Sequence, residues 1–97
     1  MLNSYELMII FNSTASDNEI KKVFDKIGQS IGKGKILSSS LFGKKNLSYS
    51  IKKQTEGIYW LLNFHADGKE AKSVNNILKM NELVLRYLQI KQIKKSN

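Results

Sequence analysis

Two stretches of the chain carry the same signal for the start of a helix, and each follows directly on a strand-like pattern. Residues 16–19 (Ser-Asp-Asn-Glu) and 67–70 (Asp-Gly-Lys-Glu) place a capping residue three positions before a glutamate, as in a capping box. Apolar residues then recur at spacings of three and four over residues 20–31 and 71–78, as on one face of a helix. Two such strand-to-helix units leave only a few ways of packing helices on a sheet.

Four segments have the side-chain alternation that is typical of strands. Residues 5–11 and 58–64 carry large apolar groups on both alternating sets, as central strands of a sheet do. Residues 35–51 and 83–93 supply the other two strands, and a hairpin loop is expected at 53–57. The order is β-α-β-β-α-β, which predicts an α+β, ferredoxin-like fold: a four-stranded antiparallel sheet with two helices on one face.

The alternation also assigns the two faces of the central strands. The rows expected to meet the helices are Leu7, Ile9 and Phe11, and Ile58, Trp60, Leu62 and Phe64. The opposite rows lie on the open face of the sheet, where nothing is expected to cover them. An uncovered apolar patch usually marks a binding surface. We therefore predict that a protein partner docks on Met8, Ile10, Tyr59 and Leu61.

The length and composition fit one small domain, residues 1–97, with a short basic tail at 92–97. No apolar run approaches the roughly 20 residues of a membrane span, so no membrane partner is expected. The net charge is +8, and it is unevenly distributed: residues 33–53 hold six lysines and no acid, and residues 86–97 hold four cations and no acid. This asymmetry favours a polyanionic partner. A generally basic protein without such a partner is the alternative.

Catalytic and metal-binding patterns are absent from the sequence. An acylphosphatase-like hydrolase of this size and topology needs an arginine in the first strand-to-helix loop to hold phosphate. Residues 12–16 contain none, and Arg86 is the only arginine of the chain. His65, the only histidine, stands at a strand end without a paired nucleophile, and no spacing resembles zinc or calcium ligands. With no cysteine either, we expect a non-enzymatic protein without metal, cofactor or small-molecule substrate.

The most specific pattern in the chain runs from residue 43 to residue 52. Apolar residues at 47, 49 and 51 alternate with polar ones, which predicts a strand with one apolar face. Gly43 in front of it can take a positive φ and indicates a bend or bulge. On pattern alone, an edge hairpin that lysines protect from aggregation explains the segment. Its cationic ends are Lys44, Lys45, Lys52 and Lys53.

This stretch resembles the signature of the bacterial-type small-subunit ribosomal protein six family. The signature is Gly, any residue, a basic residue, a polar residue, Leu, a small residue, Tyr, any residue, Ile, then a basic or small polar residue. Every place is filled here. The resemblance covers roughly residues 4–91, with Tyr-Glu opening the first strand and Leu-Arg-Tyr-Leu in the last. Asn3 and Ser4 stand where family members often have arginines, and the tail is basic where some members are acidic.

The resemblance implies a structural protein of the small ribosomal subunit, in the cytoplasm of a bacterium or within a bacterial-derived organelle. It implies binding to the central domain of small-subunit rRNA together with small-subunit ribosomal protein eighteen. The residues expected to contact rRNA are Lys44, Lys45, Lys52, Lys53, Arg86 and Lys91. For Arg86, a cross-strand ion pair with Glu6 is the alternative role.

A stand-alone RNA-recognition module has the same strand order and remains an alternative function. Such a module stacks bases on aromatic side chains of its two central strands. Residues 57–64 resemble its longer consensus, but the basic residue before the glycine is missing, and Ile58 and Trp60 break the expected positions. On the first strand the open face offers Met8 and Ile10, neither of which is a stacking ring. The sequence therefore favours the ribosomal protein.

Overall fold

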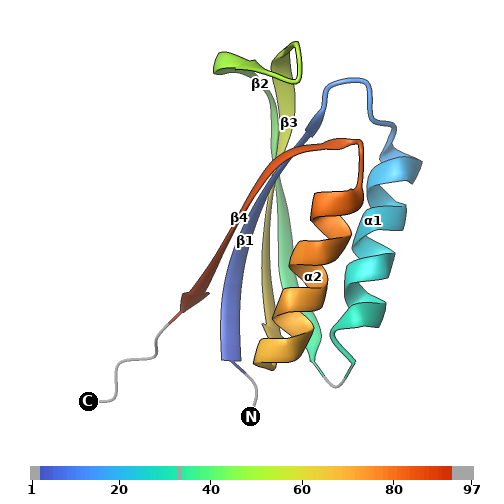
Figure 1. The fold of residues 1–97 in the computed structure, drawn as a ribbon, viewed down its shortest axis with the longest axis vertical. Helices are drawn as coiled ribbons and strands as arrows, with labels where there is room; N and C mark the ends of the chain where they lie inside the picture. The colour runs from blue at the N-terminus through green and yellow to red at the C-terminus, as the bar shows by residue number, and fades with distance from the viewer. Residues whose placement is uncertain (1–2, 33, 93–97) are drawn as a thin grey trace.

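A four-stranded antiparallel sheet carries two helices on one of its faces (Figure 1). The structure is a computed structural model that describes residues 3–32 and 34–92. The elements are β1 (Asn3–Asn12), α1 (Asp17–Ser30), β2 (Lys35–Ile51), β3 (Gln54–Ala66), α2 (Gly68–Met80) and β4 (Val84–Gln92). The sheet order is β2-β3-β1-β4, so β1 and β3 are the central strands. The predicted fold class is confirmed.

The end of the chain is described only in part. The predicted last strand, residues 83–93, is present as β4 up to Gln92. Residue 93 and the rest of the predicted tail lie outside the described residues. Within the described residues, no helix is long and apolar enough to cross a membrane.

Both predicted capping boxes are present. The amide of Glu19 donates to Ser16 Oγ over 3.2 Å, and the amide of Ser16 donates to the Glu19 carboxylate over 2.9 Å. Asp67 and Glu70 make the same two bonds over 2.8 and 3.1 Å. These bonds satisfy amides that a helix start otherwise leaves without partners. The backbone hydrogen bond from Ser16, followed by that of its side chain, lowers the pKa of the Glu19 carboxyl below its usual value.

The core lies between the sheet and the two helices, as the alternation predicts. Leu7, Ile9 and Phe11 of β1 are fully buried there, and β3 and both helices contribute further buried residues. Trp60 of β3 is partly buried and packs against the same cluster, with its ring edge-on to Phe24 of α1 at 5.0 Å between centroids. The helices are therefore held by the predicted rows.

The turn between β2 and β3 is shorter than predicted. Only Lys52 and Lys53 form it, while Gln54 already pairs with Ile51 and residues 54–57 belong to β3. Both lysines have a positive φ, 49° and 66°, as in the two-residue turns that match the twist of a hairpin. The prediction of a loop at 53–57 is wrong, because lysine rarely adopts this conformation and does not signal such a turn.

The end of this hairpin bends toward the side of the sheet that the helices leave free. Gly43 takes the predicted positive φ, 93°, beside a register shift between β2 and β3. A second shift, between Asn46 and Ile51, interrupts the pairing again. We call residues 44–53 the hairpin tip. Figure 1 shows it projecting from the upper end of the sheet, away from α1 and α2.

Candidate RNA and protein interface

The four residues predicted to dock a partner lie together on the open face. Met8 of β1 lies opposite Leu61 of β3, and Ile10 lies opposite Tyr59. Residues directly opposite each other in a sheet share a face, and α1 and α2 lie on the other side (Figure 1). Met8, Tyr59 and Leu61 are half-buried. The structure thus forms one continuous apolar surface from two strands that are distant in the sequence.

Ile10 lies on this face but beneath the hairpin tip. Its side chain is only 8% exposed. Leu47 and Ile51 of the tip line a hollow of 120 Å³ together with Ile10 and Tyr59. The expectation that nothing covers this position is therefore wrong, because the interrupted pairing after Asn46 lets the tip curl back over the end of β1.

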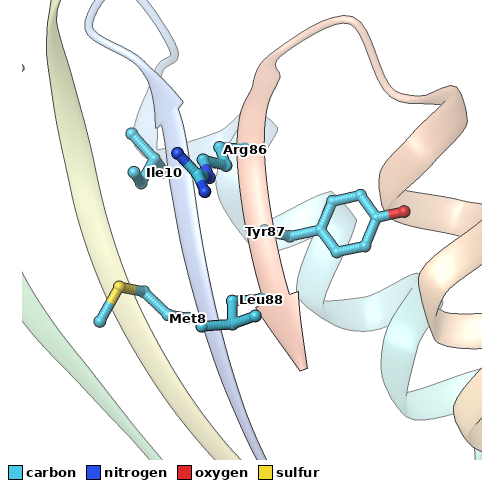
Figure 2. Close-up of a pocket in the computed structure, with 5 residues that line it drawn as sticks. All are labelled: Met8, Ile10, Arg86, Tyr87 and Leu88. Atoms are coloured by element: carbon cyan, nitrogen blue, oxygen red, sulfur yellow. The ribbon is translucent and has the colours of Figure 1, made fainter. Parts of the chain in front are cut away.

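Strand β4 enlarges the apolar surface. Leu88 lies opposite Met8 and is 56% exposed, and Ile90 on the same face is also exposed. Residues of β1 and β4 line a hollow of 240 Å³ on this face. Figure 2 shows its lining side chains: Met8 lies near Leu88, Arg86 lies beside Ile10, and the ring of Tyr87 points away from them. Sequence reasoning missed Leu88 and Ile90, although the alternation of the last strand around Arg86 carried the signal.

Arg86 connects β4 to the hairpin tip. Its Nη1 donates a hydrogen bond to the hydroxyl of Tyr49, a residue 37 positions away along the chain. Arg86 lies opposite Ile10, whereas Glu6 lies opposite Ile90. Ile10 is four positions after Glu6 along β1, which corresponds to about 13 Å. The alternative ion pair between Arg86 and Glu6 is therefore not formed.

The lysines of the hairpin tip differ in their surroundings. Lys52 donates from Nζ to the backbone carbonyl of Val84 over 3.2 Å, which ties the turn to the start of β4. Lys45 Nζ lies 5.7 Å from the ring centroid of Phe42 and 5.8 Å from that of Tyr59, within the range of cation–π attraction. Lys53 is exposed in the turn. Two of these three cations thus already interact with the protein itself.

The remaining predicted RNA contacts lie farther apart. Lys44 is opposite Ile58, whose row faces the helices, so Lys44 and Lys45 point to opposite sides of the sheet. Lys91 is opposite Tyr5, at the end of the sheet away from the hairpin tip. Lys52 and Arg86 thus each bond between the hairpin tip and β4, and Lys45 and Lys53 belong to the same tip, whereas Lys44 points to the helix side and Lys91 lies at the far end of the sheet. No group of three or more metal-ligating side chains occurs among residues 3–32 and 34–92.

Comparison with protein families identifies the class to which this architecture belongs. The family model for ribosomal protein S6 matches residues 4–91, so the chain belongs to the ribosomal protein S6 family. Members of this family are structural components of the small ribosomal subunit. The protein is therefore a ribosomal, non-enzymatic protein, and the acylphosphatase-like alternative is rejected.

Individual relatives agree with this assignment. The chain is 36% identical over 90 residues to small ribosomal subunit protein bS6 of Prochlorococcus marinus subsp. pastoris, covering 91% of the chain and 58% of that protein. It is 35% identical to the bS6 protein of Thermoanaerobacter pseudethanolicus, covering 93% and 97%. The crystal structure of 30S ribosomal protein S6 from Thermotoga maritima superposes with a TM-score of 0.81 at 23% identity, over 95% of this chain and 89% of that one. This likeness supports the fold.

Proposed function

We propose that the protein binds the central domain of small-subunit rRNA through its hairpin tip and Arg86, jointly with small-subunit ribosomal protein eighteen. In this proposal the protein partner docks on the open face. One observation supports it above the others: the exposed apolar surface of β1, β3 and β4 adjoins the cationic tip. A protein partner on this apolar surface and an RNA strand at the hairpin tip would therefore be adjacent to each other.

The chemistry of the tip suits phosphate. Lysine ammonium groups bind phosphate mainly through release of counterions, which makes the affinity depend steeply on salt. Arg86 adds a planar guanidinium that can contact two phosphate oxygens at once. Tyr49 occupies one donor of that guanidinium and leaves the others available. Phosphate contacts of this kind fix orientation rather than read sequence.

The open face suits a protein rather than nucleic acid. Met8, Leu61 and Leu88 offer aliphatic side chains that cannot pair with phosphate or base edges. Large apolar side chains at the centre of a patch, with polar groups at its rim, are the usual composition of a protein interface. Tyr59 lies at the boundary between the apolar patch and the cationic tip, because its ring belongs to the patch and also lies near the ammonium group of Lys45.

A salt titration tests the RNA contact at the tip. The affinity of the protein with its partner for an rRNA fragment would be measured across salt concentrations, for the parent and for the Lys44→Ala/Lys45→Ala variant. Each lost phosphate contact lowers the slope of log affinity against log salt by about one unit. The matched control is Lys69→Ala/Lys72→Ala, which removes two exposed cations from α2.

The single variants refine the result because the two lysines point to opposite sides of the sheet. We expect Lys45→Ala to account for most of the change. A slope that the double variant leaves at the parental value would reject the tip as an RNA contact. Equal losses in the tip and α2 variants would show that only total charge matters.

A further inference from the structure

We propose that the free edge of β2 is a docking site for a short, extended, acidic peptide segment of a partner protein, which adds to the sheet as an additional strand. This surface is separate from the open face, and it meets the proposed RNA contact only at Lys44 and Lys45, which follow the uncharged run. The proposal does not depend on the function proposed above, because the free strand edge and the groove beside it lie outside the hairpin tip. It follows from the backbone of the edge strand, from a groove beside it, and from the charges at its two ends.

Strand β2 has an unprotected edge. It is the first strand in the order β2-β3-β1-β4, so β3 pairs with one of its sides only. Its outer side presents backbone N–H and C=O groups, which natural sheets usually protect with charged residues or proline. Residues 36–43 contain neither, and Leu37, Leu41 and Phe42 in this run are exposed. Register shifts bracket a regular stretch, Ser38 to Leu41, that is long enough for one short strand.

An apolar groove runs beside this edge on the helix side of the sheet. It has a volume of 400 Å³ and lies between α1 and β2. Its apolar walls are Ile20, Phe24, Leu41 and Trp60, and its polar lining consists of Asp17, Lys21 and Ser39. Leu41 is 57% exposed at its rim. The Nε1 donor of Trp60 has no hydrogen-bond partner among the described residues although water does not reach it. In an added strand every second side chain would face this groove and cover Leu41.

The charges at the two ends of the run identify the partner as acidic. Lys35 precedes the uncharged run and Lys44 and Lys45 follow it, all three exposed. No acid occurs between residues 33 and 53. A second copy of this chain would place Lys35 opposite Lys44 in an antiparallel pair, where like charges repel. An acidic segment meets a cation at either end instead.

The backbone chemistry favours a peptide over RNA. The exposed edge offers both donors and acceptors, and a strand supplies the complement of each. Phosphate groups are acceptors only, and the 2′-hydroxyl and base donors of RNA do not recur at the spacing of the β2 carbonyl groups as the amides of a paired strand do. The apolar groove also matches an aliphatic side chain rather than a sugar–phosphate chain.

The probe for this proposal is a blocked peptide in which glutamate and valine alternate over eight positions. It would be titrated into the ¹⁵N-labelled protein while amide shifts are followed by NMR. We expect saturable shifts confined to residues 35–44 and the indole of Trp60, and slower hydrogen exchange of the β2 amides. Added salt should weaken the binding, and a peptide with lysine in place of glutamate should not bind.

Two matched leucine variants separate the edge from the open face. Leu41→Ser should weaken peptide binding about fivefold, because Leu41 borders the groove. Leu88→Ser removes an equally exposed leucine from the opposite face and should leave binding unchanged. Because both side chains are more than half exposed, both variants should keep the melting temperature of the parent.

Several outcomes would overturn the proposal. If the β2 amides do not shift at about 1 mM peptide, the proposed site is rejected. A Kd of 1 mM corresponds to a binding free energy of about −4 kcal/mol. Shifts centred on Met8 and Tyr59 would move the contact to the open face. Equal weakening of peptide binding by the two leucine variants would show that binding is not specific to the β2 edge. Equal β2 shifts with an oligouridine RNA would assign the edge to RNA. Concentration-dependent dimerisation through β2 would assign it to a second copy of this chain.

Discussion

The basic residues of the hairpin tip and Arg86 make different contacts, although the sequence does not distinguish them. Lys52 caps the carbonyl of Val84, Lys45 lies over two aromatic rings, and Arg86 bonds to Tyr49. Lys53 is exposed in the turn. A phosphate that approaches the tip would therefore meet some cations held in place and others free to move. Held cations lose less conformational entropy on binding, which makes Arg86 the most informative single position.

Arg86→Lys should lower the affinity for rRNA by about 1 kcal/mol, because lysine cannot copy a planar, two-oxygen contact. The thermal unfolding of the free protein should change little, since the bond to Tyr49 lies at the surface. Both quantities would be measured on the same sample, by RNA titration and by calorimetry. Tyr49→Phe is the control, as it removes the internal partner of Arg86 and keeps its charge. A less stable Arg86→Lys variant with parental RNA affinity would mean that the arginine serves the fold.

At Gly57 the packing leaves no room for a side chain. A Cβ at this position would collide with a methyl group of Ile10 and lie 3.3 Å from the carbonyl oxygen of Phe11. We expect Gly57→Ala to lower the free energy of unfolding by about 2 kcal/mol, because the packed tip cannot shift freely. Gly28→Ala is the contrasting variant: its site in α1 is open, and alanine should stabilise that helix by up to about 1 kcal/mol. Urea unfolding measures both, and similar values for the two would contradict the packing at Ile10.

At the level of the elements, the sheet separates stability from binding. The row of β3 that faces the helices is part of the core, whereas the alternate row contacts solvent and the hairpin tip. Leu62 lies in the core row and Tyr59, three residues earlier, lies in the row on the open face. Leu62 therefore represents stability and Tyr59 represents binding. The same strand can therefore tolerate change on one face and not on the other.

Tyr59→Ala should weaken binding of small-subunit ribosomal protein eighteen by about 2 kcal/mol, as for an aromatic anchor of an interface. It should destabilise the free protein less than Leu62→Ala, which removes a fully buried side chain at a cost of about 3 kcal/mol. The measurements are calorimetric affinity for the partner and chemical denaturation of the protein alone. If Tyr59→Ala unfolds the protein as strongly as Leu62→Ala, the open face belongs to the core. If neither quantity changes, the partner docks elsewhere.

At the level of the whole molecule, the positive charge is spread over both ends of the sheet. Lys45 pairs with Gly57 near the tip, and Gly57 lies opposite Asn12 of β1. Lys91 lies opposite Tyr5, seven residues back along β1, which places the two cations about 23 Å apart along the strand. Exposed charges at this distance are screened from each other in physiological salt.

Because of this separation, the effects of Lys45→Ala and Lys91→Ala on rRNA affinity should add within about 0.5 kcal/mol. A double-mutant cycle on the rRNA fragment measures this directly. Strong coupling would indicate that the RNA reorganises when either contact is lost. If Lys91→Ala has no effect by itself, the RNA contact is confined to the tip, in contrast to the expectation from charge alone.

Local signals in the sequence determined most of the fold. The capping boxes at Ser16 and Asp67, the alternation in the central strands and the bulge at Gly43 each depend on neighbouring residues only, so they could be predicted without a structure. The order of the elements then left one arrangement, since right-handed connections place both helices on one face of the sheet. The assignment of Met8, Tyr59 and Leu61 to the open face follows from the same alternation.

The conformation and contacts of the hairpin tip were decided only by the tertiary structure. Lys52 and Lys53 adopt a turn that their residue type disfavours, and a register shift of β2 against β3 carries the tip over Ile10. The bond between Tyr49 and Arg86 joins residues from two strands that are not neighbours in the sheet. None of these features has a local sequence signal, because each depends on where distant segments come together. The sequence by itself therefore determined the elements and their faces, and packing decided which cations and apolar groups remain exposed.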